Sequence, residues 1–460
     1  NRSQGITSIA VLPFTNASGD ANSDYVSDGI SETLIDKLSQ LPGLKVIART
    51  SAFKYKGKDI DPQEVATALG VEAILTGRVV QRGDQLQVRA ELINARDKTQ
   101  LWGEQYSRQM TDLQAVQEEI ARAISEKLRV RLTGAEEQRL SKRATTNPEA
   151  YQHYLNGVYS IRAGGSQISL ALDHFSEAVA LDPKFALAWA GVSNAYVLLA
   201  NNGVIDPKEG FPKAKAAVKT ALELDDTLAE AHASQAFIMI SEWDWSGAER
   251  EFKRAFELNP NLADAHSRYG GLLSRLGRHT EALEEVKRSQ ELDPLDLRLR
   301  AREGAVLFFA RRYDEALQKF DSILTVLPDD ASSLIYRAYS YDGKGMYKEA
   351  VAAYETAISK GNTTTSTQSL LGYALTQLGR KNEAQAILEK LKTTKEYVSP
   401  AELAVLYLGL GDKEGALALL EKAYLAHDLQ MQYLKIDKHY DSLRSDPRFI
   451  ELMKKVGLPQ

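Results

Sequence analysis

Cysteine is absent from this chain of 460 residues. Its absence excludes disulfide bonds, thiolate metal ligands and cysteine nucleophiles, although it does not identify a cellular compartment. Long apolar runs are also absent, since no window approaches the roughly 18 consecutive apolar residues of a membrane-spanning helix. The chain has no signal-peptide pattern and begins at Asn1 instead of methionine, so we expect it to be part of a longer protein.

Charge of one sign is not in excess either. The chain has 57 lysine and arginine residues against 62 aspartate and glutamate residues, which gives a net charge of −5. It therefore lacks an overall basic field that would hold nucleic acid or an anionic membrane surface, and we expect no nucleic acid partner for this part of the protein. Because 460 residues exceed what one hydrophobic core normally serves, we expect at least two domains.

The larger part of the sequence is repetitive. A small residue returns every 34 residues, at Ala248, Ala282, Ala316, Ala350 and Ala384, and Pro260, Pro294 and Pro328 keep the same step. Each alanine lies in a similar context, as in GRHTEALEEVKRSQELDP: a short turn, an apolar pair, a bulky residue four positions later and a helix end. This pattern resembles the tetratricopeptide repeat (TPR), a pair of antiparallel helices per unit.

Packing explains these residue types. A small residue lets two helices approach closely, and large side chains such as Phe252, Phe320 and Tyr354 fill the space beside it. Each hairpin leaves an apolar face open, so neighbouring units must stack. Less regular units precede and follow the clean ones, and we expect about eight hairpins over residues 149–427 and a capping helix segment over 428–460.

Residues 1–145 lack the 34-residue step and contain more β-branched runs. The patterns predict helices over residues 24–41 and 112–132 with a short one from Pro62, and strands over residues 9–14, 44–48, 73–81, 85–95 and 99–108. The order β-α-β-α-β-β-β-α is that of a compact α/β domain. The predicted fold class is therefore an α/β N-terminal domain followed by an all-α TPR solenoid, a right-handed superhelix of helical hairpins.

The first 145 residues also resemble a known family. The segments VLPF, GISETLIDKL, GVEAILTGRV, RAELINA, LWGEQY and DLQAVQEEIARAI are similar, in order and spacing, to the TolB amino-terminal-like domain. The resemblance implies a bacterial signalling protein in which this domain and the TPR units follow a membrane helix and a serine/threonine kinase, a nucleotide cyclase or a winged-helix DNA-binding domain. It favours an extracytoplasmic location, with the cytoplasm as the alternative. This chain has no Gly-rich kinase loop and no HRD or DFG motif.

We find no constellation of residues that would support catalysis. The loop TNASGDANS after the first strand has one glycine and no Lys-Ser or Lys-Thr, so it matches neither a Walker A loop nor the GxGxxG fingerprint. A plain polar loop is the favoured interpretation, although a helix N-terminus can bind an anion without a motif. Asp20, Asp24 and Asp28 are not spaced as an acid and base pair. We predict no catalytic residue and no cofactor.

Histidine and tryptophan raise two smaller hypotheses. His232 and His266 occupy equivalent positions of neighbouring repeats, but such positions lie on the order of 10 Å apart while zinc ligands lie within about 2.1 Å of the ion. Packing or surface roles are therefore favoured, and we predict no metal site. Trp243 and Trp245 lie in a turn between helices, where they either pack on a neighbouring unit or form a contact surface.

The repeat register predicts which side chains face a concave groove, where such solenoids usually hold partners. In the family pattern, positions two, five, six, nine and thirteen of each first helix point there. The candidate partner-binding residues are Asn194, Phe237, Arg268, Arg275, Arg298, Arg302, Tyr336 and Tyr339. Part of the family grips a terminal carboxylate with lysines, asparagines and an arginine. Here Ala233, Phe237 and Arg268 replace three of those five residues, so the full clamp is absent.

An arginine strip with neighbouring tyrosines remains, and it suits an acidic or phosphorylated segment of a partner. The competing interpretation is intramolecular pairing with nearby carboxylates, namely Glu281, Glu284, Glu285, Glu303 or Asp314. The leading functional hypothesis is a non-enzymatic protein–protein interaction or scaffold module that binds a protein or peptide. The alternative is a small-molecule sensor that binds its ligand through the α/β domain, and a hydrolase based on the carboxylates of that domain is the least supported.

Overall fold

The computed structural model describes residues 6–20, 23–128, 130, 132–202 and 204–459. The chain divides into two compact units. The first comprises Asn1–Met239, Ser246–Ala265 and Ser289–Asp296, and the second comprises Ile240–Trp245, His266–Arg288 and Leu297–Gln460. The first unit thus contains an α/β domain together with helical hairpins, whereas the second is helical throughout its described residues.

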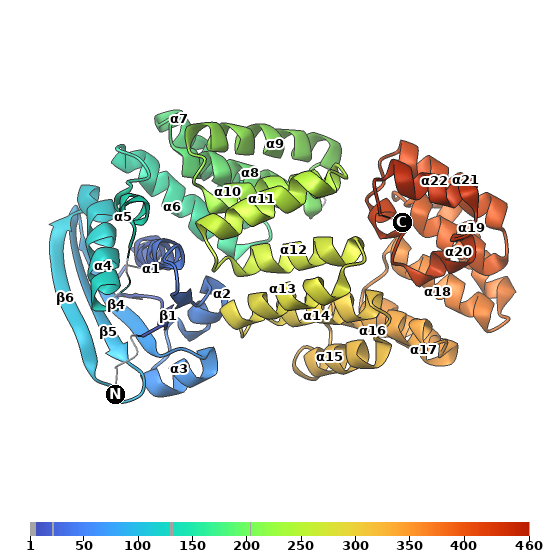
Figure 1. Cartoon of the computed structure of the whole chain (residues 1–460), viewed down its shortest axis with the longest axis horizontal. Coiled ribbons are helices and arrows are strands. Elements are labelled where there is room, and N and C mark those ends of the chain that lie inside the picture. The colour runs from blue at the N-terminus through green and yellow to red at the C-terminus, as the bar shows by residue number, and fades with distance from the viewer. Residues whose placement is uncertain (1–5, 21–22, 129, 131, 203, 460) are drawn as a thin grey trace. The chain divides into compact units, whose positions relative to one another are not determined.

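A mixed sheet forms the centre of the α/β domain (Figure 1). Its strands are β1 (Ser8–Val11), β2 (Thr15–Asn16), β3 (Lys45–Val46), β4 (Ala73–Arg82), β5 (Gln85–Asn94) and β6 (Gln100–Gln109). The strand order is β3-β1-β4-β5-β6, and β2 also pairs with β4. Strand β1 is parallel to both of its neighbours, while β4, β5 and β6 form an antiparallel meander.

Helices cover one face of this sheet and part of the other. Helices α1 (Asp24–Ser39) and α4 (Leu113–Lys127) pack with Ile9 and Val11 on one face. Helices α2 (Arg49–Ala52) and α3 (Pro62–Leu69) lie on the other face, where Ala10 and Leu12 of the same strand segment point. Successive side chains alternate between the two faces because the strand repeat is two residues.

Several elements differ from the sequence prediction. The strand predicted over residues 9–14 ends at Val11, because Pro13 has no N–H to donate to the ladder, and pairing resumes in β2. The helix predicted over 112–132 ends at Lys127, and residues 129 and 131 of that range lie outside the described residues. Helix α5 (Gly134–Ser141), which begins with a capping box between Thr133 and Glu136, was not predicted.

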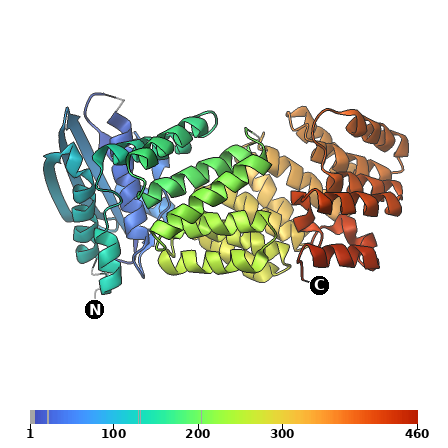
Figure 2. The same cartoon turned by 90° about the horizontal axis from the view of Figure 1, so that it is seen from above.

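Helical hairpins follow the α/β domain (Figures 1 and 2). In the described part of the chain there are eight. They are α6 (Pro148–Ala163) with α7 (Gln167–Leu181), α8 (Ala186–Asn201) with α9 (Pro207–Leu224), α10 (Ala229–Ser241) with α11 (Trp245–Leu258), α12 (Ala263–Arg275) with α13 (His279–Leu292), α14 (Leu297–Phe309) with α15 (Tyr313–Val326), α16 (Ala331–Gly343) with α17 (Tyr347–Ser359), α18 (Thr365–Gln377) with α19 (Lys381–Thr393), and α20 (Pro400–Leu410) with α21 (Lys413–Leu425).

The repeated small and large residues meet at the helix crossings. Ala316 and Phe320 on α15 are fully buried, and the Phe320 ring lies against Gly304 on α14, where an added Cβ would be 2.6 Å from its Cζ atom. Phe175 on α7 approaches Gly157 and Gly191 in the same way. The glycine and the large ring are thus two halves of one contact, which a larger side chain in place of the glycine would prevent.

The α/β domain and its linker contact the turns between hairpins in the first unit. The contacting turn residues follow the second helix of a hairpin, and three of them keep the 34-residue step. The pairs are Asp182 with Thr145, Asp225 with Lys142, Asn259 with Ser39, and Asp293 with Ser51. The aspartate or asparagine that follows each second helix therefore has two roles. It favours the end of the helix, and its side chain also forms a polar contact that joins the hairpin to the N-terminal region.

The chain continues beyond the last hairpin as two 3-10 helices and one α-helix. These are η4 (Leu429–Tyr433), η5 (Lys438–Leu443) and α22 (Pro447–Lys455). We call residues 428–446 the C-terminal segment. Among the described helices, none combines the length and the apolar character needed to cross a membrane.

Candidate functional site

The eight candidate groove residues all lie on first helices of hairpins. In the first unit, Asn194 lies on α8 and Phe237 on α10, and both side chains are half-buried. In the second unit, Arg268 and Arg275 lie on α12, Arg298 and Arg302 on α14, and Tyr336 and Tyr339 on α16. The first helices α14 and α16 pack side by side, as do α18 and α20, so side chains from neighbouring hairpins share one surface in this unit.

The C-terminal segment lies on this surface of the second unit. The Tyr433 ring stacks on Phe309, with centroids 5.3 Å apart and an interplanar angle of 14°. On α12, Arg275 donates from Nη2 to the Tyr433 hydroxyl at 3.2 Å, and its guanidinium carbon is 5.2 Å from the ring centroid. Part of the predicted groove surface is therefore in contact with the chain's own C-terminal residues.

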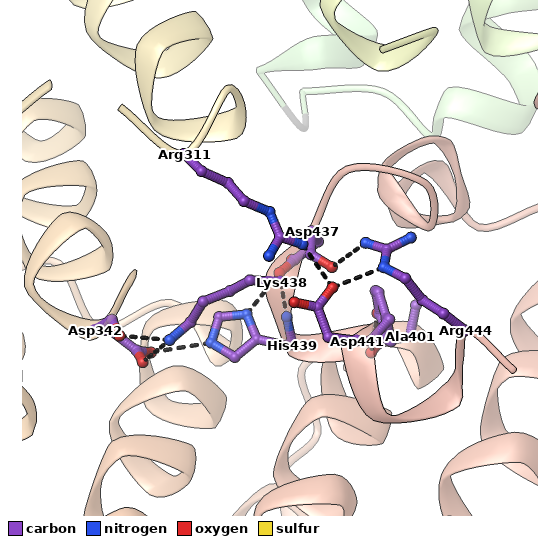
Figure 3. A network of polar contacts seen from close by, with 9 residues as sticks. Arg311, Asp342, Ala401, Asp437, Lys438, His439, Asp441 and Arg444 are labelled. Atoms are coloured by element: carbon purple, nitrogen blue, oxygen red, sulfur yellow. Dashed lines mark hydrogen bonds and ion pairs between the residues drawn. The ribbon is translucent and has the colours of Figure 1, made fainter. Parts of the chain in front are cut away.

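A buried ion network fixes the same segment further along (Figure 3). His439 lies between two carboxylates, with Nε2 2.9 Å from Asp342 Oδ2 and Nδ1 2.7 Å from Asp437 Oδ1. Lys438 approaches the same aspartate on α16, with Nζ 2.6 Å from Asp342 Oδ1. The His439 ring also meets Tyr373 edge-on, with centroids 4.5 Å apart.

The protonation of this network follows from its geometry. Burial alone would lower the pKa of His439, but the carboxylates of Asp437 and Asp342 and their hydrogen bonds raise it to about 9. Burial would raise the pKa of Asp342, but His439 and Lys438 hold it below its usual value. His439 is therefore a buried imidazolium at neutral pH, and it ties the C-terminal segment to α16.

A small polar cavity lies between the C-terminal segment and helices α18 and α20. Its lining includes Ser369, Glu402, Gln430 and Asp437. Burial raises the pKa of Glu402 to about 7, and its Oε1 accepts a hydrogen bond from Gln430 Nε2 at 3.2 Å. The buried hydroxyl of Ser369 has no hydrogen-bond partner among the described residues, so this cavity has capacity for a further polar group or water.

The carboxylates expected to compete for the arginine strip form other ion pairs. The pairs are Glu281 with Arg278, Glu285 with His266, Glu303 with Lys319, and Asp314 with Lys344. Three of the five carboxylates named from the sequence thus have cations of their own, and Glu285 has the imidazole of His266 as its partner. Burial lowers the pKa of Arg302, and the positive charges of Arg275 and Arg268 lower it further. Arg302 accordingly lies near other positive charges within the second unit.

The two equivalent histidines have the same structural role in their own hairpins. His232 Nδ1 is 2.6 Å from Glu251, and His266 Nδ1 is 2.6 Å from Glu285. Each pair joins the first helix of a hairpin to its second helix. Within the residues that the structure describes, no group of three or more histidine, cysteine, aspartate or glutamate side chains is arranged to hold a metal ion.

The two tryptophans of the turn before α11 pack against C-terminal residues of the second unit. Trp243 stacks on His427, with centroids 3.8 Å apart, and Trp245 donates from its indole N–H to the Val456 carbonyl at 2.8 Å. Of the two interpretations from the sequence, packing within the chain describes these side chains.

The carboxylates near the first strand form a cluster with a lysine. Asn16 donates to Asp24 at 2.7 Å, and Lys56 Nζ lies 3.2 Å from Asp24 and 2.9 Å from Asp28. Burial raises the pKa of Asp28, against the opposing effect of Lys56. In the loop before this helix, Gly19 has a positive φ of 79°, which fits a turn, and residues 21 and 22 lie outside the described residues.

Family comparisons identify both regions of the chain. Residues 4–123 match the second domain of HilA/YgeH-like transcriptional regulators. Residues 244–296, 302–364 and 366–396 match tetratricopeptide repeats. The TPR prediction is confirmed, whereas the N-terminal match is to the HilA/YgeH-like model and not to the TolB-like family that the sequence resemblance indicated. Buried residues such as Leu12, Phe14 and Trp102 carried that resemblance, and such residues indicate a shared α/β core more than a particular family.

Similar proteins include one curated relative and several solved structures. A curated relative, "Putative adenylate cyclase 3" of Rhizobium meliloti (strain 1021), is 40% identical over 187 residues, which are 40% of this chain and 32% of the relative. The chain thus spans about a third of the curated relative that it matches. Among solved structures, PilF of Pseudomonas aeruginosa is 22% identical with a TM-score of 0.36, covering 45% of this chain and 90% of that chain. YrrB, described as a TPR protein with an unusual peptide-binding site, is 22% identical with a TM-score of 0.32, covering 45% and 97%.

Proposed function

We propose that this chain is a non-enzymatic protein–protein interaction module that forms the sensory or regulatory region of a bacterial signalling protein. The observation that carries the proposal is the TPR array, and each candidate residue lies on the first helix of a hairpin. The names of the similar proteins support it, since one is a putative adenylate cyclase and one family model describes transcriptional regulators. A regulatory region shared by proteins with different outputs fits both names.

The partner we propose is a protein or peptide, and first-helix residues of both units contact it. In the first unit Asn194 and Phe237 offer an amide and an aromatic ring, a combination that suits a peptide backbone and an apolar side chain. In the second unit the arginines add positive charge, which suits an acidic segment. The same proposal includes a membrane helix that precedes this chain in the full-length protein and an extracytoplasmic location for the chain itself.

The proposal is tested by site-specific photo-crosslinking in bacteria that make the full-length protein. A photoreactive residue replaces Asn194 or Phe237 in turn, and the matched control carries it at Lys219, an exposed residue on the second helix α9. The proposal expects a discrete protein adduct from both test positions and none from the control. No adduct at either position, or equal adducts at all three, would count against it.

The alternative is a small-molecule sensor. The observation that favours it is the cluster of Asp24, Asp28 and Lys56, in which Asp28 Oδ1 is buried without a hydrogen-bond partner among the described residues. A buried acceptor beside a lysine suits a ligand with a hydrogen-bond donor. A metabolite whose thermal stabilisation of the full chain disappears in Asp28→Asn would support this function, and a library without such a metabolite would argue against it.

A further inference from the structure

Two arginines of the second unit place their guanidinium groups over one backbone position. Gly271 lies on α12, and a Cβ atom there would be 3.2 Å from Arg275 Nη1 and 3.6 Å from Arg302 Nη1. Because Arg275 comes from α12 and Arg302 from α14, the two positive charges converge from different hairpins. Arg268 adds a third positive charge that acts on Arg302.

The guanidinium groups of Arg275 and Arg302 have few acceptors within the described residues. Among the described residues, Arg302 has neither an ion pair nor a hydrogen bond. The Nε atom of Arg275 is buried without a hydrogen-bond partner among the described residues, and Nη2 of the same side chain donates to the hydroxyl of Tyr433. Buried positive groups normally have a charged or hydrogen-bonded partner, since leaving them without one is costly. Arg275 and Arg302 therefore have donor capacity for an anion.

The donors of the arginine side chains favour one class of anion over another. Arginine presents a planar set of five donors that matches phosphate and carboxylate oxygens two at a time. A phosphate monoester offers three terminal oxygens and a charge between about −1.5 and −2 at neutral pH, whereas a carboxylate offers two oxygens and one charge. Two guanidinium groups with unused donors converge beside the Tyr433 hydroxyl. They match a phosphate monoester better than a carboxylate, because the phosphate has the larger charge and more acceptor oxygens.

We propose that Arg275 and Arg302, with Tyr433, bind the phosphoryl group of a phosphorylated protein partner. The proposal rests on the proposed function, since it names the group of the partner that the second unit recognises. The C-terminal segment supplies Tyr433, so the site is complete when this segment lies on α12 and α14. Binding of the phosphoryl group therefore holds the segment in place.

The experiment titrates the full chain with phenyl phosphate, inorganic phosphate, a phosphotyrosine peptide and its unphosphorylated form, with calorimetry as the readout. The variant Arg302→Gln removes one guanidinium group, and Arg312→Gln is the control, because Arg312 is exposed and paired with Glu315. The wild type is expected to bind the phosphorylated probes, with the phosphopeptide tightest. Arg302→Gln should weaken this binding at least about tenfold, and Arg312→Gln should leave it within about twofold.

Hydrogen exchange of residues 429–443 supplies a second readout that does not depend on the stability of the variant. In the wild type, phenyl phosphate should slow exchange in this stretch, and in Tyr433→Phe the protection should be smaller.

If inorganic phosphate binds as tightly as the phosphopeptide, the site binds phosphate, but its ligand is a free phosphate compound and the protein partner is refuted. Failure of all probes to bind, or equal loss in Arg302→Gln and Arg312→Gln, would overturn the proposal. Crosslinks from Phe237 without phosphate binding would refute this site and leave the interaction module intact.

Discussion

Replacing His439 tests how the C-terminal segment is held. The ordinary pKa of histidine is 6.5, and the two carboxylates raise that of His439 to about 9 when the segment is docked. Below pH 6.5 the imidazole is protonated in both the docked and the released segment, and the full stabilisation is present. As the pH rises from 6.5 to 9 the docked form retains a proton that the released form has lost. The stabilisation then falls by about 3 kcal/mol, at about 1.4 kcal/mol per pKa unit.

The assay is hydrogen exchange of residues 429–443 in the full chain between pH 6 and pH 9.5, corrected for the pH dependence of chemical exchange. The free energy of local opening in the wild type should decrease with pH by about 3 kcal/mol, and His439→Gln should remove this slope. The control His153→Gln removes a histidine from the first unit and should retain the slope. Parallel pH profiles for the wild type and His439→Gln would refute the account of this buried network.

Two further predictions concern packing and the inter-hairpin turns. Gly304→Ala should lower the stability by about 1–3 kcal/mol, because the new methyl group meets the Phe320 ring at 2.6 Å. Thermal unfolding of Gly134→Ala, whose methyl group meets no atom within 4 Å, is the control. Asp293→Asn should raise the free energy of unfolding at pH 8 by up to about 3 kcal/mol. Burial raises the pKa of Asp293 to about 6, so the folded protein pays a penalty for the ionised carboxylate at pH 8 that the asparagine variant avoids. The amide oxygen retains an acceptor for Ser51, and a variant less stable than the wild type would show that this reasoning is wrong.

The hairpins were predictable because their packing imposes a periodic pattern. A small residue such as Ala316 and a large one such as Phe320 recur at a fixed step, and both are fully buried. Ile9, Ala10 and Val11 point alternately to the two faces of the sheet, but all three are apolar, so the sequence shows no polar–apolar alternation. The sequence therefore could not predict that helices pack on both sides of this strand.

The contacts of the C-terminal segment could not be predicted in this way. His439, Asp437 and Tyr433 lie outside the repeat and in 3-10 or irregular structure, so no periodicity relates them to Asp342 or Arg275. A signal was nevertheless present, since LQMQYLKIDKHYDSL has too many apolar and aromatic residues for a solvated tail. The 34-residue repeat predicted that Arg275 and the other arginines of the strip lie on first helices. It did not indicate that Tyr433 contacts Arg275.

The central claim is that first-helix side chains hold a protein partner. The most direct test is the affinity of the purified crosslinked partner for three forms of the full chain, measured by calorimetry. These are the wild type, the double variant Asn194→Ala with Arg298→Ala, and the control Lys219→Ala with Lys253→Ala on second helices. The account predicts that the first double variant binds at least about tenfold more weakly and the control within about twofold of the wild type. Equal affinities for all three forms would contradict it.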